Sequence, residues 1–99
     1  MTFELKDTVL LISGIRELSA GNAAEFKSRA RSQFAAGLMQ IDLDCHELGF
    51  LDSSGLGALI SLQKLAGERG GKLRLLSPRP VVLQILELTR LHRTFEIVS

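Results

Sequence analysis

The sequence DSSGLGALISL, at residues 52–62, determines how the rest of the chain is interpreted. An aspartate and two serines stand where a strand is expected to turn into a helix, and apolar residues then recur at helical spacing. Gly55 and Gly57 fall in the first turns of this helix, although a glycine there costs about 1 kcal/mol relative to alanine. Because glycine has no side chain, a partner's backbone or a phosphate can approach it closely. The stretch therefore combines a structural turn, at which Ser53 is the expected helix cap, with a candidate binding surface.

Strand and helix patterns alternate on both sides of this stretch. Short apolar or alternating runs predict strands at 3–6, 9–12, 39–43, 72–76 and 95–98, and the run at 9–12 is expected to be buried on both faces. Helical spacing predicts one helix from 23 to just before Gly37, a second from 53 to Gly70–Gly71, and a third from 80 to about 91. Residues 45–52 are interpreted as a connecting segment.

This order of elements is typical of an α/β domain. Strands that alternate with helices favour right-handed crossovers, so we expect a small mixed, mostly parallel β-sheet of four or five strands with helices packed mainly on one face. Functional groups in such a sheet gather where strands end and helices begin. The expected core includes Leu43, Leu56, Leu59, Ile60, Leu75 and Leu86.

Length and composition limit what the chain can be. Its 99 residues are enough for one core, so we expect a single domain over residues 1–99. Twelve basic and eleven acidic side chains are interspersed, which gives no basic patch for direct nucleic-acid binding. No apolar stretch approaches the roughly 18 residues of a membrane span. The lone Cys45 cannot form an internal disulfide, and with no signal peptide evident, the cytoplasm is the expected location.

Motifs for catalysis or metal binding are incomplete. Cys45-His46 lacks the second ligand pair of a structural zinc site, so neither a metal nor another cofactor is expected. The segment 67–73 resembles a phosphate-binding loop, but its spacing is one residue short and no Ser or Thr follows Lys72. A Ser-His-Asp triad around Ser53 would need a Gly-x-Ser-x-Gly turn, which is absent. We expect no catalytic residue, which leaves a small nucleotide-binding or hydrolytic protein as a remote alternative.

Several motifs together resemble the STAS family, which is named for sulfate transporters and anti-sigma factor antagonists. The resemblance rests on Asp-Leu-Asp at 42–44, on the stretch 48–59 with its Asp-Ser-Ser-Gly-Leu-Gly core, and on Gly-Gly-Lys-Leu at 70–73. It continues through Ser77-Pro78 and the segment from Val82 to Phe95. The segment 14–19 before the first expected helix departs from the family's usual Gly-x-Leu-Asp. It is longer, and no aspartate follows its leucine.

The resemblance implies a function as an anti-sigma factor antagonist. In such proteins the serine after the aspartate, here Ser53, is phosphorylated by an anti-sigma factor that is also a serine protein kinase, and a serine phosphatase reverses the modification. When unphosphorylated, the antagonist sequesters the anti-sigma factor and a sigma factor is released. An alternative within the family is a non-catalytic STAS subunit docked on a lipid-transport ABC ATPase. The implied partner-binding residues are Asp52, Ser53, Ser54, Gly55, Leu56 and Gly57.

Overall fold

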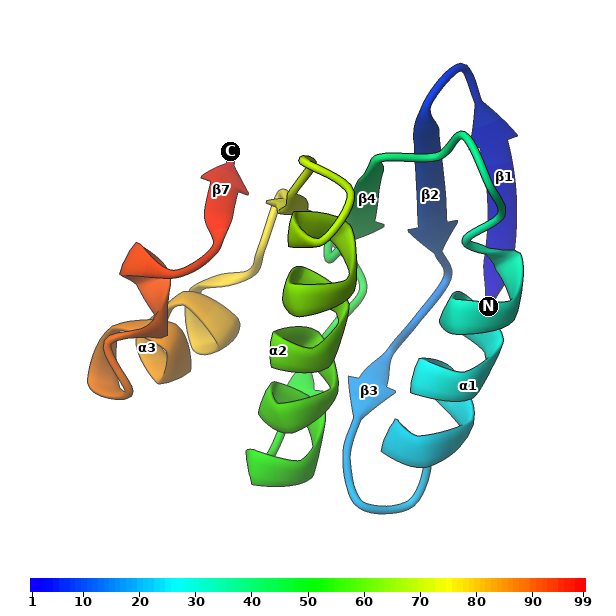
Figure 1. Cartoon of the computed structure of the whole chain (residues 1–99). Helices are drawn as coiled ribbons and strands as arrows, with labels where there is room; N and C mark the ends of the chain where they lie inside the picture. Colours follow the sequence, from blue (N-terminus) through cyan, green and yellow to red (C-terminus); the bar gives the residue numbers. More distant parts are fainter.

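The architecture is a five-stranded sheet with helices on one side, and the computed structural model describes all residues 1–99 (Figure 1). The helices are α1 (Ala23–Gln33), α2 (Ser53–Gly67), α3 (Pro80–Leu88) and the short 3-10 helix η1 (Leu91–Arg93). None of them is long and apolar enough to cross a membrane. The strands are β1 (Thr2–Lys6), β2 (Val9–Ser13), β3 (Glu17–Leu18), β4 (Gln40–Asp44), β5 (Phe50–Leu51), β6 (Leu73–Leu76) and β7 (Glu96–Val98).

The main sheet has the strand order β1-β2-β4-β6-β7. β1 and β2 form an antiparallel hairpin, and the pairs β2–β4, β4–β6 and β6–β7 are parallel, so the expected mixed and mostly parallel sheet is confirmed. Two short strands were not predicted. β3 and β5 form a separate parallel pair, with Glu17 opposite Phe50 and Leu18 opposite Leu51. β5 therefore lies inside the segment that was interpreted as a connection.

One face of the sheet carries the core. The side chains of Leu10, Ile41 and Leu75 on this face are fully buried, and α1 and α2 lie side by side in front of it (Figure 1). The expectation that the run at 9–12 is buried on both faces was wrong, because helices cover one side and residues 9 and 11 are only half-buried. Of the expected core residues, Ile60 is half-buried, and Leu43, Leu56, Leu59, Leu75 and Leu86 are buried.

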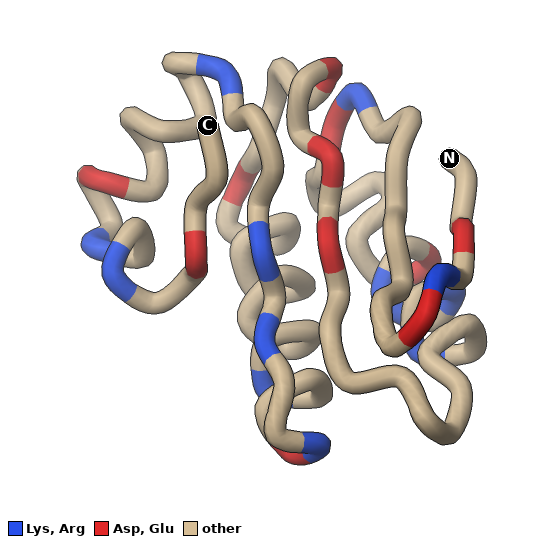
Figure 2. Tube along the Cα trace, turned by 90° about the horizontal axis from the view of Figure 1, so that it is seen from above, with Lys and Arg blue, Asp and Glu red and all other residues tan.

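The opposite face of the sheet holds charged side chains in pairs. Asp42 on β4 is only 7% exposed and accepts hydrogen bonds from Arg74 Nε and Nη2 at 3.0 and 2.8 Å. Lys72 Nζ lies 2.8 Å from a carboxylate oxygen of Glu96. Acidic and basic segments accordingly alternate on neighbouring strands (Figure 2). These pairs compensate the charges on the side of the sheet that no helix covers.

The two helices that face the sheet end at well-defined contacts. α2 ends at Gly67, three residues before the Gly70–Gly71 pair where its end was predicted. In the turn that follows, the guanidinium of Arg69 donates to the carbonyls of Phe34 and Leu38 at 2.9 and 3.2 Å and lies over the Phe34 ring at 4.1 Å. Arg69 therefore supplies donors to a carbonyl at the end of α1 and to one in the loop that follows it. This contact joins the ends of α1 and α2.

Candidate functional site

The turn into α2 positions the Asp-Ser-Ser motif at the end of β5. Asp52 has an extended backbone (φ −113°, ψ −173°) and is the N-cap of the helix, and its Oδ1 accepts a hydrogen bond from the Gly55 amide at 3.0 Å. Ser53 is already the first helical residue. The prediction that Ser53 caps the helix was therefore wrong, because a cap side chain reaches the amide three residues further on and here Asp52 does so.

Asp52 also connects α2 to the loop before α1. Its Oδ2 accepts a hydrogen bond from the amide of Ala20, 32 residues earlier, at 3.0 Å. The hydrogen bonds from the Gly55 and Ala20 amides lower the pKa of the Asp52 carboxyl below its ordinary value. The carboxylate is thus ionised at neutral pH, and its two oxygens fix the relative positions of the two segments.

The two serines of the motif are both exposed. Ser53 and Ser54 occupy the first two positions of α2, so the structure does not separate them into a turn residue and a helical residue. Accessibility is therefore shared by both hydroxyls, and the choice between them rests on the family's motif.

The two glycines of the motif have different surroundings. Gly55 is buried, and a Cβ on it would collide with the carbonyl oxygen of Leu18 and with the side chain of Leu51. Gly55 thus allows α2 to pack closely on the β3–β5 pair. Gly57 is exposed, and no atom outside its own stretch of helix lies within 4 Å of the position its Cβ would take. Leu56, between the two glycines, is buried in the core.

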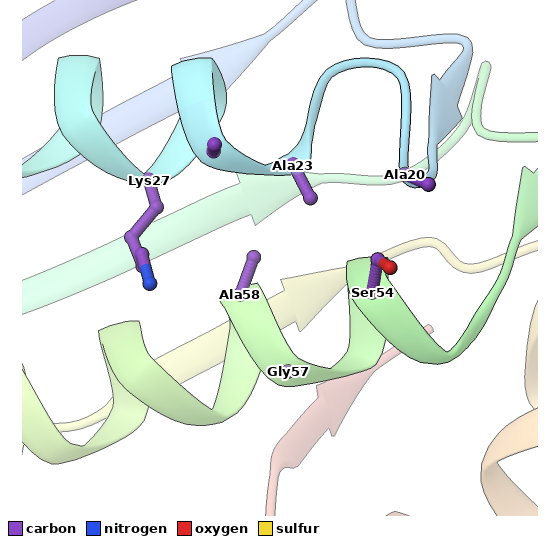
Figure 3. Close-up of a pocket in the computed structure, with 7 residues that line it drawn as sticks. Ala20, Ala23, Lys27, Ser54, Gly57 and Ala58 are labelled. Atoms are coloured by element: carbon purple, nitrogen blue, oxygen red, sulfur yellow. The ribbon is translucent and has the colours of Figure 1, made fainter.

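A groove of about 370 Å³ lies between α1 and α2, next to the serines. Ala58 of α2 points toward α1, and Lys27 of α1 points toward α2 (Figure 3). The groove was not predicted, because its two walls come from segments about 30 residues apart whose packing no local pattern reveals. It is lined by Ala20, Ala23, Ala24, Lys27, Ser54, Gly57 and Ala58.

Cys45 and His46 follow β4 and differ in their exposure. Cys45 is fully buried, and desolvation, with a smaller effect from Asp44, raises the pKa of its thiol to about 12. The Nδ1 of exposed His46 lies 2.8 Å from an Asp44 oxygen. This hydrogen bond and the charge of Asp44 raise the pKa of His46. The two adjacent residues thus point into different environments.

The chain is similar to a known domain family and to several solved structures. The family model of the STAS domain matches residues 1–99. TM1081 of Thermotoga maritima, a candidate anti-sigma factor antagonist, is 26% identical with a TM-score of 0.86, over 99% of this chain and 85% of that one. The anti-sigma factor antagonist SpoIIAA in its unphosphorylated form is 20% identical with a TM-score of 0.84, over 99% and 87%. The phosphorylated form of this Bacillus cell fate determinant is also 20% identical, with a TM-score of 0.69 over 99% and 90%.

Proposed function

The chain belongs to the STAS domain family, and we propose that it is an anti-sigma factor antagonist that is switched by phosphorylation of Ser53. In this proposal the unphosphorylated domain binds an anti-sigma factor that is also a serine kinase, so that a sigma factor is released. A serine phosphatase restores the binding form. The likeness to TM1081, at 26% identity over nearly the whole chain, supports this role. The domain itself performs no chemical step and needs no cofactor.

The observation that carries the proposal is the exposed position of Ser53 at the start of α2, directly after the ionised Asp52. A kinase must bring the γ-phosphate in line with an accessible oxygen, and this hydroxyl is accessible. The resulting phosphate adds roughly −1.5 to −2 charges. The start of a helix tolerates such a charge, because backbone N–H groups point out of it. Phosphorylation is therefore compatible with the fold.

The same charge is expected to break a complex that covers the turn. In an interface the phosphate loses water and lies beside the carboxylate of Asp52, which the Gly55 and Ala20 amides hold in place. Two unit charges about 5 Å apart at an effective dielectric constant of about 20 change an equilibrium constant roughly a hundredfold. One phosphate is thus sufficient to switch binding without unfolding the domain.

The test is phosphorylation by the cognate kinase with ATP, followed by site-resolved mass spectrometry. We expect phosphate on Ser53 in the wild-type domain and in the Ser54→Ala control, and none in Ser53→Ala, which remains bound to the kinase. Ser53→Asp should keep the circular dichroism spectrum of the wild type and weaken binding roughly a hundredfold. Phosphate on Ser54 alone, or wild-type affinity in Ser53→Asp, would show that the switch lies elsewhere.

The exposed hydroxyl also bears on the alternative of a STAS subunit docked on a lipid-transport ABC ATPase. A docking subunit needs no phosphate acceptor at this turn, whereas a switched antagonist does. Neighbouring genes separate the two roles. A gene for an ATPase-fold kinase beside this one supports the switch, and lipid-transporter genes support the subunit.

A further inference from the structure

Gly57 has no role in the fold that explains its presence. It lies inside α2 with an ordinary helical backbone, and its Cβ position faces open space. Alanine at such a position stabilises a helix by up to about 1 kcal/mol relative to glycine. At position 55, two residues earlier, the fold does require glycine, because a Cβ there would collide with the Leu18 carbonyl oxygen. The small size of residue 57 therefore matters for something outside the chain.

The position that Gly57 leaves open belongs to the groove between α1 and α2. Four of the six other residues that line the groove are alanines, so mostly short side chains project into it (Figure 3). Its volume of about 370 Å³ equals that of roughly twelve molecules of liquid water. It is open to solvent on one side. A groove of this size accommodates a protruding side chain of a partner protein.

Lys27 adds a positive charge to one wall of this groove. Its side chain points from α1 toward α2, and it takes part in none of the ion pairs of the chain (Figure 3). Arg29, two residues further along α1, lies 3.9 Å from Glu25 and over the ring of Phe3. Arg29 thus has partners on its own chain, whereas Lys27 presents its charge to the groove.

We infer that the groove between α1 and α2 receives an apolar side chain of the anti-sigma factor kinase, flanked by a carboxylate that pairs with Lys27. This inference rests on the proposed function and specifies where its partner binds. Ser54 lines the groove and Ser53 precedes it, so the docked segment and the phosphorylation site share one interface. Gly57 keeps the groove open, and Lys27 selects an acidic partner segment over a basic one.

Variants that fill the groove or reverse its charge test the inference. The Cβ of Gly57→Leu meets no atom outside its own stretch of helix within 4 Å, and the rest of the side chain has the open groove to extend into, so the fold is expected to persist. Gly67→Leu is the matched control, because Gly67 also has open space around its Cβ position but ends the same helix ten residues further on. Lys27→Glu is paired with Lys64→Glu, an exposed lysine in the last turn of α2.

Binding to the cognate kinase is measured by calorimetry, with circular dichroism to verify the fold of each variant. We expect Gly57→Leu to weaken binding roughly a hundredfold and Lys27→Glu about tenfold, and both controls to stay within twofold. The difference in affinity between Lys27→Glu and the wild type should shrink in 1 M salt, because the lost contact is ionic.

Different results would refute the proposed function and the docking of the kinase in the groove. A wild-type domain that neither binds the kinase nor is phosphorylated by it refutes the proposed function. If the wild type binds and is phosphorylated on Ser53, but folded Gly57→Leu and Lys27→Glu bind as tightly, the groove is not the docking site and the proposed function stands.

Discussion

His46 and Asp44 form a pair at the carboxyl end of β4 whose charge depends on pH. The imidazole Nδ1 and an Asp44 oxygen are 2.8 Å apart, and Glu47 lies 3.9 Å from the other ring nitrogen. These contacts raise the pKa of His46 above its ordinary value of 6.5 in the folded state. The pair therefore contributes stability that is fully present below pH 6.5 and is lost as the pH rises through the folded-state pKa.

An NMR titration of the His46 ring protons checks this assignment. The wild-type midpoint should lie above 6.5, and Asp44→Asn should move it back toward that value, because the hydrogen bond to a carboxylate is its main cause. A wild-type midpoint at or below 6.5 would contradict the pairing.

The thiol of Cys45 is expected to be unreactive in the folded domain. It is fully buried with its pKa raised to about 12, and its Sγ lies 3.5 Å from the Leu43 carbonyl. The nucleophilic thiolate is thus scarce and inaccessible at pH 8. Labelling with a thiol reagent should proceed only when the domain opens, and should become fast in urea. Rapid labelling of the native protein would argue against this burial.

Cys45→Ser tests whether the cysteine has any role beyond packing. A serine hydroxyl in the same place can donate to the Leu43 carbonyl, so the domain should still fold. We expect kinase binding within a few-fold of the wild type, and zinc at well below one equivalent in purified protein. Stoichiometric zinc or a large loss of binding would assign Cys45 a functional role.

At the scale of the element, Gly55 and Gly57 in the first turns of α2 should respond in opposite directions to the same substitution. Gly55→Ala forces a Cβ against the Leu18 carbonyl and is expected to lower the free energy of unfolding by at least about 2 kcal/mol. Gly57→Ala meets no atom and should raise it by about 0.5–1 kcal/mol. Urea denaturation of the two variants measures both values. Equal effects of the two substitutions would show that helix propensity alone governs them.

At the scale of the whole molecule, the core is continuous. The 24 buried apolar residues form one cluster that draws on the main sheet, on all three α-helices and on the β3–β5 pair, so no part has a core of its own. A chain of this size with one core is expected to unfold in a single cooperative step. Calorimetry should give equal calorimetric and van't Hoff enthalpies for residues 1–99. Two resolved transitions would contradict a single domain.

Local patterns in the sequence determined most of the architecture. Short apolar or alternating runs predicted the main strands, and helical spacing predicted three helices close to α1, α2 and α3. These predictions held because each depends on the period of one element, and the period is visible in the chain itself. The position of the Asp-Ser-Ser motif at the start of α2 was predicted for the same reason.

Only the tertiary structure decided the features that depend on contacts between segments far apart in the sequence. Two-residue strands such as β3 and β5 have no period, so only their pairing defines them. Gly55 and Gly57 look alike in the sequence, but the Leu18 carbonyl lies against one and solvent against the other. Asp52, and not the expected Ser53, is the cap of α2, and its second carboxylate oxygen accepts a hydrogen bond from the Ala20 amide, 32 residues away. Such contacts form between segments that packing brings together, and a pattern within one segment carries no information about them.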